Sequence, residues 1–471
     1  MALYRKLRIN GDRLNHTIQS TCTSWGLLAN STGMRRLALS QEDKEVRDWL
    51  VEQCKAVGCD VKVDQMGNIF ATRPGQSKDK RPIAMGSHLD TQPAGGRYDG
   101  ILGVTAALEV LRTLHENDIQ THCPISLIDW TNEEGARFPG AMMCSGVWST
   151  KSATGLEACY AIKDADGISM KKALEHIGYL GDTPCDCREN GLECYFELHI
   201  EQGPKLEAAG KRVGVVTGVQ AMKWYAIRVS GVEGHSGTTP MNTRSDALVT
   251  ASLMIAAVRD IAMSTRLGFA TVGVITNDTQ SQATIPSGVE FIIDVRCSTD
   301  KIVEDLYLAI FISLDKIVQQ ENNSTRYRVV RTWGLPESTF HDDCIGVVRS
   351  AAVDEVGLTE IMDMTSNAGH DASVRAISLH HISRAPIFTS REHVSCSRYS
   401  LHFLKGTVHV ANPLKWASKV VKTSMIFVPS EGGISHNPSE YTSPEDCALG
   451  AQVLLQAVIR YDEVVKSGEI S

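Results

Sequence analysis

Side chains able to bind divalent metal ions occur in five short segments of this chain. The segments are 87–90 (Ser-His-Leu-Asp), 98–100 (Tyr-Asp-Gly), 132–135 (Asn-Glu-Glu-Gly), 198–201 (Leu-His-Ile-Glu) and 435–437 (Ser-His-Asn). Together they supply enough imidazole and carboxylate groups for two divalent ions, with one carboxylate left over as a base. Their order along the chain is typical of a dinuclear hydrolase.

Asp99 is suited to lie between the two ions. Two divalent ions about 3.5 to 4 Å apart repel each other and need a bridging anion. Asp99 is followed by Gly100, which has no side chain and therefore lets the backbone and a metal ion approach closely. We assign His88, Asp99 and His199 to one ion, and Asp99, Glu134 and His436 to the other. Asp90 is expected to orient the imidazole of His88 through a hydrogen bond.

Glu133 and Glu134 are adjacent, so at the end of a strand they cannot both face the same way. One of them can ligate a metal while the other stays free to take a proton from a water molecule. A bound metal lowers the pKa of such a water from 15.7 to about 7. We expect Glu134 to be the ligand and Glu133 to be the general base.

Length and composition limit the classes of protein to consider. A chain of 471 residues exceeds one ordinary hydrophobic core, so two domains are expected. The net charge of -8 and the pI near 6.0 argue against a nucleic-acid partner. The thirteen cysteines are scattered, and the N-terminus lacks an apolar targeting segment, which favours reduced thiols in the cytoplasm. No apolar run approaches the roughly 18 residues that span a membrane.

The elements that must position the metal-binding residues follow an α/β pattern. We expect a helix at 40–58, capped by Ser40 with Asp43, a strand at 82–85 before His88, and a helix at 100–114. Further strands are expected at 125–130 and 195–198, and a last helix begins after Ser443. Because polar residues stand at the strand ends, the site is expected at the carboxyl edge of the sheet.

A second module is expected between 219 and 332. Its pattern is strand 223–231, helix 245–262, strands 271–276 and 288–297, helix 303–320 and strand 327–332. This is a compact α+β module inserted into the first domain. The catalytic domain would then comprise 1–218 and 333–471.

The stretch 374–422 differs in composition from the remainder. It has eight Lys and Arg, one acidic residue, Glu392, and five of the fifteen histidines. Three interpretations stay open: a long surface loop, a segment translated from an unspliced intron or a faulty gene model, and a regulatory insertion. The second is favoured because long loops without internal pattern are uncommon in compact domains.

Longer motifs around these residues resemble the N-carbamoyl amino acid amidohydrolases, particularly the β-ureidopropionase (β-alanine synthase) type, of the dinuclear zinc peptidase clan. The motifs include SHLDTQPAGGRYDGILG, DWTNEEGARFPGAMMCSG, ELHIEQGP, GHSGTTPMNTRSDAL and MIFVPSEGGISHNPSEYTSPED. The resemblance extends from near the N-terminus to about residue 460, apart from 374–422. It implies a zinc-peptidase-like α/β catalytic domain with an inserted ferredoxin-like α+β domain that acts as a lid and forms a homodimer.

The resemblance also implies roles for individual residues. Glu133 matches the general base, and His88, Asp99, Glu134, His199 and His436 match the ligands of two divalent ions, most often Zn, with Mn, Co or Ni as alternatives. In the inserted module, His235 matches an oxyanion-stabilising histidine that reaches the neighbouring subunit, and Arg296 matches the guanidinium that holds the substrate carboxylate. Gln202 and His370 match residues of the substrate pocket.

The expected activity is hydrolysis of the carbamoyl C–N bond of a small ureido acid, with N-carbamoyl-β-alanine favoured. N-carbamoyl-L-α-amino acid hydrolysis and allantoate hydrolysis are the alternatives, and a catalytically silent binding protein of the same fold is the alternative from another class. The family commonly has Asn where this chain has Ala283, before Thr284-Ile285-Pro286. One polar contact to substrate is therefore expected to be missing.

Overall fold

The computed structural model describes residues 6–150, 153–320, 325–373 and 421–468. The predicted insertion 374–422 lies outside these residues except for its last two positions, and Lys422 already begins a strand. The described residues form two compact units. The first comprises 6–219, 338–373 and 421–468, and the second comprises 220–337.

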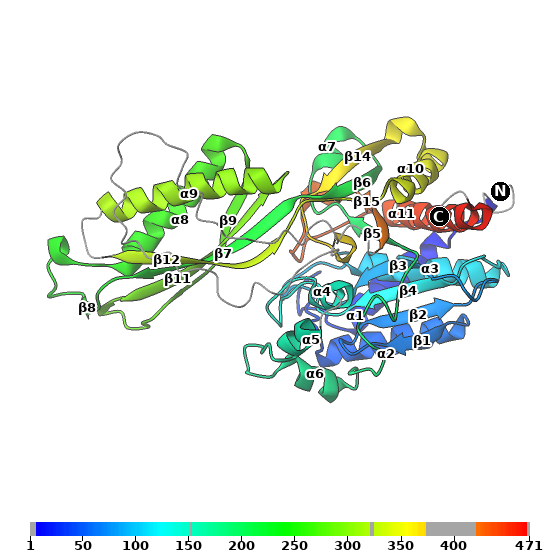
Figure 1. The fold of residues 1–471 in the computed structure, drawn as a ribbon, viewed down its shortest axis with the longest axis horizontal. Coiled ribbons are helices and arrows are strands. Elements are labelled where there is room, and N and C mark those ends of the chain that lie inside the picture. The colour runs from blue at the N-terminus through cyan, green and yellow to red at the C-terminus, as the bar shows by residue number, and fades with distance from the viewer. Residues whose placement is uncertain (1–5, 151–152, 321–324, 374–420, 469–471) are drawn as a thin grey trace. The chain divides into compact units, whose positions relative to one another are not determined.

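A nine-stranded mixed sheet forms the centre of the first unit (Figure 1). Its order is β1 (Asp60–Val63), β2 (Ile69–Arg73), β4 (Ile125–Trp130), β3 (Ile83–His88), β5 (Cys194–Ile200), β15 (Lys422–Val428), β6 (Val213–Val219) and β13 (Ser338–Thr339), with β14 (Ile361–Ser366) also paired to β6. The four central strands β4, β3, β5 and β15 are parallel to one another. All four are almost completely buried, because helices cover the sheet; this explains their near-continuous apolar sequences.

The helices of the first unit are α1 (Gly11–Ser24), α2 (Gln41–Ala56), α3 (Ile101–Glu116), α4 (Met143–Thr150), α5 (Ala153–Tyr160), α6 (Met170–Ile177), α7 (Lys205–Ala209), α10 (Asp342–Val356) and α11 (Pro444–Ser467). Of these, α2, α3, α10 and α11 pack against the sheet. The predicted helix at 40–58 is confirmed as α2. Ser40 caps it by accepting a hydrogen bond from Asp43 N, but the Asp43 carboxylate accepts from Leu39 N instead of Ser40 N.

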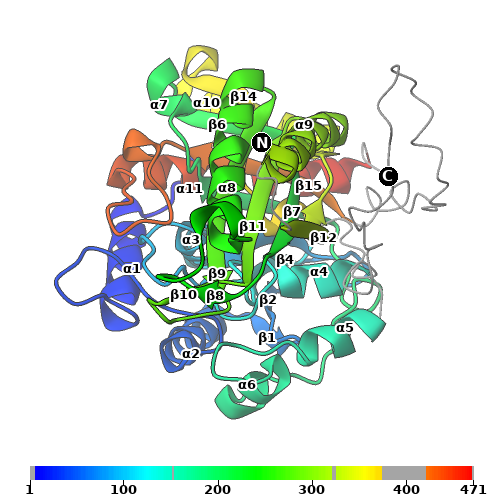
Figure 2. The ribbon, with the colours of Figure 1, turned by 90° about the vertical axis from the view of Figure 1, so that its left-hand side faces the viewer.

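The second unit is a four-stranded antiparallel sheet with two helices. The strands β7 (Ala221–Ser230), β9 (Gly268–Asn277), β11 (Gly288–Cys297) and β12 (Arg326–Leu335) are arranged in the order β12-β7-β11-β9. This is the strand order of ferredoxin-like folds. The helices α8 (Ala247–Thr265) and α9 (Asp300–Gln320) lie side by side in both views (Figures 1 and 2). Because β12 continues to Leu335, the unit ends after the predicted residue 332.

One described helix, α8, has the length and apolar composition that could cross a membrane. Its residues Ala247, Ala251, Met254 and Val258 are buried in the core of the second unit against β7, β11 and α9. Packing in this core explains the apolar character of these four positions, whereas Val249, Leu253 and Met263 of the same helix are exposed.

Candidate dinuclear metal site

The predicted metal ligands of the first unit gather at the carboxyl ends of its parallel strands. His88 is the last residue of β3, and His199 is the second-to-last residue of the neighbouring strand β5. Glu133 and Glu134 follow β4, and His436 follows β15. Neighbouring parallel strands end at one edge of the sheet, so residues far apart in sequence meet there.

Asp99 lies at the centre of this group and presents one carboxylate oxygen to each side. Oδ1 is 3.0 Å from His199 Nε2 and 3.7 Å from His88 Nε2. Oδ2 is 3.3 Å from His436 Nε2, which in turn lies 3.4 Å from Glu134 Oε2. Two sets of potential ligand atoms therefore share Asp99, namely His88–Asp99–His199 and Asp99–Glu134–His436, each with its ligand atoms within 4.8 Å of one another.

The imidazoles of His88 and His199 are held with Nε2 toward Asp99. Nδ1 of His88 is 2.9 Å from the main-chain oxygen of Asp90, and Nδ1 of His199 is 2.9 Å from the main-chain oxygen of Ile200. A carbonyl oxygen can only accept, so each Nδ1 carries a proton and Nε2 is the nitrogen that a metal ion could bind in the neutral ring; Gly100 N also approaches Nε2 of His199, at 3.3 Å. Asp90 orients His88 as predicted, but it does so through its main-chain oxygen. Its carboxylate lies 3.9 Å from His88 Nδ1 and accepts from the main-chain N–H groups of Glu133 and Glu134.

Glu133 and Glu134 take up different environments. Glu134 Oε2 accepts a hydrogen bond of 2.7 Å from Gln92 Nε2 and lies beside His436. Glu133 Oε2 lies 3.6 Å from His88 Nε2, and no described residue hydrogen-bonds its carboxylate. The main chain of Glu133 is fixed on both sides, because Asp90 accepts from its N–H and Met142 donates to its carbonyl at 2.6 Å. Glu133 is thus a buried, rigidly mounted carboxylate without a hydrogen-bond donor.

The charges of this site favour bound cations. Burial raises the pKa of Glu133 well above its usual range and that of Glu134 to about 7, and neighbouring carboxylates add to both shifts. Burial would also raise the pKa of Asp99, but hydrogen bonds from His199, His436 and His88 outweigh it and hold that pKa well below its usual range. Three carboxylates buried together repel one another, and divalent cations relieve that repulsion. The donor set therefore fits metal ions.

Gln202 and His370, predicted to line the substrate pocket, both lie next to the ligand groups. Gln202 Nε2 donates to Asp99 Oδ2 at 2.8 Å, while its buried Oε1 has no hydrogen-bond partner among the residues that the structure describes. The backbone of Gln202 has a φ of 58°, an uncommon conformation for a residue with a side chain. His370 is buried, contacts the ring of His199 edge-on at 4.5 Å and lies 2.9 Å from Ser366 Oγ through Nε2.

His235 and Arg296 belong to the second unit, where each has a defined local setting. His235 is exposed in β8 (Gly234–His235), which pairs with β10 (Thr284–Ile285), and its Nδ1 accepts a hydrogen bond of 3.0 Å from Gly237 N. In the neutral ring the proton is then on Nε2, which is free to donate. Arg296, on β11, donates to Asp294 Oδ2 through Nε and Nη2 at 2.9 and 2.7 Å.

Three residues near the ligands were not predicted. Gln92 donates to Glu134, and Glu440 accepts from the main-chain N–H groups of Tyr98 and Asp99. Glu197 is buried in β5 and accepts from Ser87 Oγ at 2.6 Å and from Ala372 N at 2.9 Å. The sequence signal for each is its spacing from a predicted ligand: Glu440 and Gln92 stand four residues after His436 and His88, and Glu197 stands two residues before His199 in β5.

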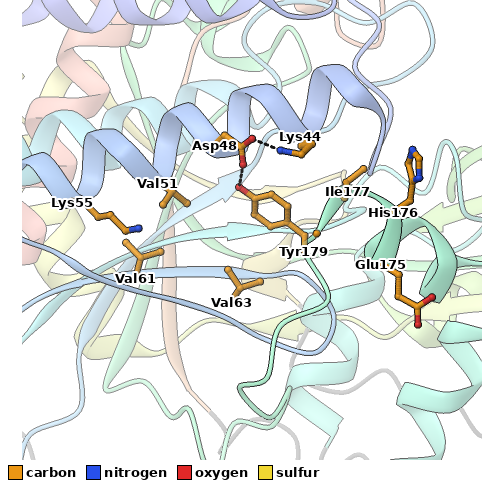
Figure 3. Close-up of a pocket in the computed structure, with 11 residues that line it drawn as sticks. Lys44, Asp48, Val51, Lys55, Val61, Val63, Glu175, His176, Ile177 and Tyr179 are labelled. Carbon is orange, nitrogen blue, oxygen red and sulfur yellow. Dashed lines mark hydrogen bonds and ion pairs between the residues drawn. The ribbon is translucent and has the colours of Figure 1, made fainter.

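A surface hollow of about 570 Å³ lies elsewhere on the first unit, between α2, β1 and the residues after α6 (Figure 3). Tyr179 Oη donates to Asp48 Oδ1 at 2.9 Å across it, and Lys44 also pairs with Asp48. None of its lining residues is a predicted ligand or substrate-binding residue. The hollow is therefore separate from the metal-binding residues.

Comparison with known proteins identifies the family. Residues 84–389 match the model of the peptidase family M20/M25/M40, which is about 65% of the chain. The chain belongs to this M20 family. It is similar to the N-carbamoyl-L-amino-acid amidohydrolase of Rhizobium meliloti, with 35% identity over 98% of both chains. It is also similar to the N-carbamoyl-L-amino acid amidohydrolase of Geobacillus stearothermophilus, with 31% identity over 91% of this chain and 93% of the relative. Among solved structures, an amidase of the hydantoinase/carbamoylase family from Burkholderia vietnamiensis is similar, with a TM-score of 0.82 and 36% identity over 97% of this chain and 98% of that chain.

These similarities place the chain in the N-carbamoyl amino acid amidohydrolase branch of the M20 family. The predicted fold class is confirmed, because the mixed α/β architecture and the similar solved structure agree. This M20 protein is a hydrolase of C–N bonds, as the sequence predicted. Metal dependence is general in the family and agrees with the candidate ligand groups around Asp99.

Proposed function

We propose that this M20 enzyme hydrolyses the carbamoyl C–N bond of a linear N-carbamoyl-L-α-amino acid. The products are the free amino acid, CO2 and ammonia. The observation that carries the proposal is the position of Asp99 between two sets of His and carboxylate ligands, with the Glu133 carboxylate 3.6 Å from His88 and without a donor in the described part of the chain. The names of the two relatives favour an α-amino acid over the N-carbamoyl-β-alanine that the sequence motifs suggested.

Two divalent ions would be held by the two ligand sets, His88–Asp99–His199 and Asp99–Glu134–His436. Zn is the first candidate, and Mn, Co or Ni also suit His and carboxylate ligands. When bound, such ions act as Lewis acids that acidify a water molecule and polarise the ureido carbonyl group. Two predicted ligands, His88 and His199, have their Nε2 atoms presented by main-chain hydrogen bonds, so their ligand geometry is prepared by the fold.

Glu133 would act as the proton carrier of the reaction. It takes a proton from the attacking water as the new C–O bond forms at the ureido carbon, and it gives a proton to the leaving nitrogen as the C–N bond breaks. The carbamic acid that remains decomposes to CO2 and ammonia. A buried carboxylate beside the ligand groups suits both steps, because it can hold the proton away from solvent between them.

Four further residues would bind the substrate. The Oε1 of Gln202, which has no partner among the described residues, can accept a hydrogen bond from a ureido N–H group, and His370 lies beside His199 in the same unit. From the second unit, Arg296 would bind the substrate carboxylate as a fork, and His235 would donate through Nε2 to the oxyanion. Arg296 is paired with Asp294, so a substrate carboxylate would share or replace that partner.

A homodimer and a lid role for the second unit are part of this proposal. Strand β9 is at the edge of its sheet, pairs only with β11 among the described strands and exposes Phe269, Val274 and Ile275. An apolar edge strand of this length would aggregate unless another chain covers it. We also infer a cytoplasmic enzyme, because all twelve described cysteines are free, buried thiols.

Two experiments test the proposed function. Rates on N-carbamoyl-L-methionine, N-carbamoyl-β-alanine and allantoate would rank the three substrate classes, and the highest kcat/KM is expected for the first. The substitution Glu133→Gln is expected to keep the bound metal and to lower kcat about 100- to 10,000-fold, since a positioned general base contributes that much. A variant with the wild-type kcat would remove Glu133 from this role, and no turnover of any ureido acid by the wild-type protein would favour the silent binding protein.

A further inference from the structure

Glu440 connects two ligand segments that are far apart in the sequence. Its side chain is buried, with the residue only 5% exposed. One carboxylate oxygen, Oε1, accepts hydrogen bonds of 3.0 Å from the main-chain N–H groups of both Tyr98 and Asp99. The other oxygen, Oε2, accepts from Ser435 Oγ at 2.9 Å, and Ser435 immediately precedes His436. One carboxylate thus joins the segment of Asp99 to the segment of His436.

Two more hydrogen-bonded contacts close a ring around Asp99. Ser435 Oγ lies 3.2 Å from Asp99 Oδ2, and Gln202 Nε2 lies 2.8 Å from the same oxygen. Gln202 Nε2 is also 3.1 Å from Ser435 Oγ. Asp99 Oδ2 is the oxygen that faces His436, so the ring that begins at Glu440 fixes the orientation of Asp99 on that side.

His436 depends on this ring more than the other histidines do. His88 and His199 are buried on strands, and a main-chain oxygen fixes Nδ1 of each. The side chain of His436 is 52% exposed and its backbone has a φ of 53°, which is uncommon for a residue with a side chain. Among the described residues, its imidazole pairs with the carboxylates of Asp99 and Glu134.

We propose that Glu440 is a positioning residue that sets the spacing of Asp99 and His436 and thereby builds the Asp99–Glu134–His436 ion position. This inference rests on the metal ligands proposed above. The ion position at His88, Asp99 and His199 keeps its own supports and depends on Glu440 only through Asp99. Loss of Glu440 should therefore weaken one ion position much more than the other.

The sequence offers variants that separate hydrogen bonding from charge. In Glu440→Gln, the amide oxygen can still accept from Tyr98 and Asp99, and the amide nitrogen can donate to Ser435 Oγ, whose hydroxyl then donates to Asp99. Glu440→Ala removes all of these contacts. Gly96→Ala perturbs Glu440 without altering it, because a Cβ at Gly96 would lie 2.3 Å from Glu440 Cβ.

Asp462 provides the matched control. It is buried to a similar degree, with 6% exposure, and accepts from two consecutive main-chain N–H groups, those of His122 and Cys123, at 2.7 and 2.6 Å. Asp462→Ala therefore removes the same kind of contact from the same unit without touching a predicted ligand. Thermal melts of every variant would report its stability independently of metal binding.

The experiment is equilibrium dialysis of each full-length protein against buffered Zn²⁺, followed by metal analysis. About two ions per subunit are expected for the wild type, Asp462→Ala and Glu440→Gln, and about one for Glu440→Ala and Gly96→Ala. The affinity of the second ion should fall about 10- to 100-fold, as it does when residues that orient a ligand are lost. The inference would be overturned if Glu440→Ala and Gly96→Ala both bound two ions with the affinity of the wild type. It would also be overturned if Glu440→Gln lost the second ion as fully as Glu440→Ala does. Fewer than two ions in the wild type would instead overturn the proposed metal ligands.

Discussion

The substitution Gly100→Ala tests whether close packing around His88 builds the metal site. Gly100 precedes α3 with φ 69° and ψ -46°, a conformation that residues with a Cβ rarely adopt. A Cβ there would lie 2.4 Å from Cε1 and Nε2 of His88, so either the imidazole or the backbone of Gly100 must move. The strain of such a conformation is about 1 to 3 kcal/mol. The displacement of His88 adds a second effect, because His88 is a predicted ligand.

Gly58→Ala is the matched control for the strain alone. Gly58 also has a positive φ, 80°, but a Cβ there would meet no atom within 4 Å. We expect Gly58→Ala to lower the free energy of unfolding by about 1 to 2 kcal/mol, the cost of a left-handed conformation, and to leave metal binding unchanged. Gly100→Ala should lower the free energy of unfolding by at least as much. It should also bind an ion at His88 at least about 100-fold more weakly, because the loss of a ligand should weaken binding more than the loss of a group that only orients a ligand.

The assay combines urea unfolding in EDTA with zinc titration in the presence of a competing chelator. Unfolding in EDTA reports the strain without the contribution of bound ions, and the titration reports the ligand geometry. If Gly100→Ala binds two ions with the affinity of Gly58→Ala, then His88 is not held against Asp99 by the packing described here. The reasoning from Gly100 to the metal site would then be refuted.

Three other predictions concern thiols, substrate and ions. Burial raises the pKa of Cys22, Cys59 and Cys297 to about 11, so these thiols should stay protonated at pH 8 and resist iodoacetamide in the native protein. Peptide mass mapping of the labelled protein can check this, and fast labelling would contradict their burial. Ala283 precedes β10, which pairs with β8. The substitution Ala283→Asn should lower KM about tenfold or more at similar kcat, because it would restore a polar contact worth about 1.5 to 3 kcal/mol. An unchanged KM would contradict this. Removal of bound metal ions by a chelator should lower the calorimetric Tm, because an ion present at 100 times its Kd stabilises the folded state by about 2.7 kcal/mol per site. An unchanged Tm would show that no ion is bound.

The sequence predicted the elements that position the site because those elements have strong local patterns. The apolar run before Glu133 is strand β4 with the predicted ends, and the run before His88 is strand β3, which continues past the predicted end at residue 85 to His88; a strand buried on both faces is apolar throughout. The strand predicted at 288–297 in the second module matches β11 at both ends. Ser40 and Ser443 cap the helices predicted to follow them, because a hydroxyl oxygen satisfies a free N–H group of the first turn.

The sequence could not show which groups hold the predicted ligands in place. Asp90 does hold His88, but through its main-chain oxygen, while its carboxylate accepts main-chain hydrogen bonds from residues 43 and 44 positions later. Glu440 contacts Asp99 across 341 positions. Contacts of this kind depend on how strands and loops meet in the folded chain, and a single sequence carries no periodic pattern for them.

The measurement that tests the central claim most directly is anomalous X-ray diffraction at the zinc absorption edge from crystals of the zinc-loaded enzyme. Two peaks about 3.5 to 4 Å apart are expected, one between His88, Asp99 and His199 and the other between Asp99, Glu134 and His436. The Glu133 carboxylate should lie beside both peaks without ligating either. A single peak, or two peaks that do not share Asp99, would contradict the dinuclear site proposed here.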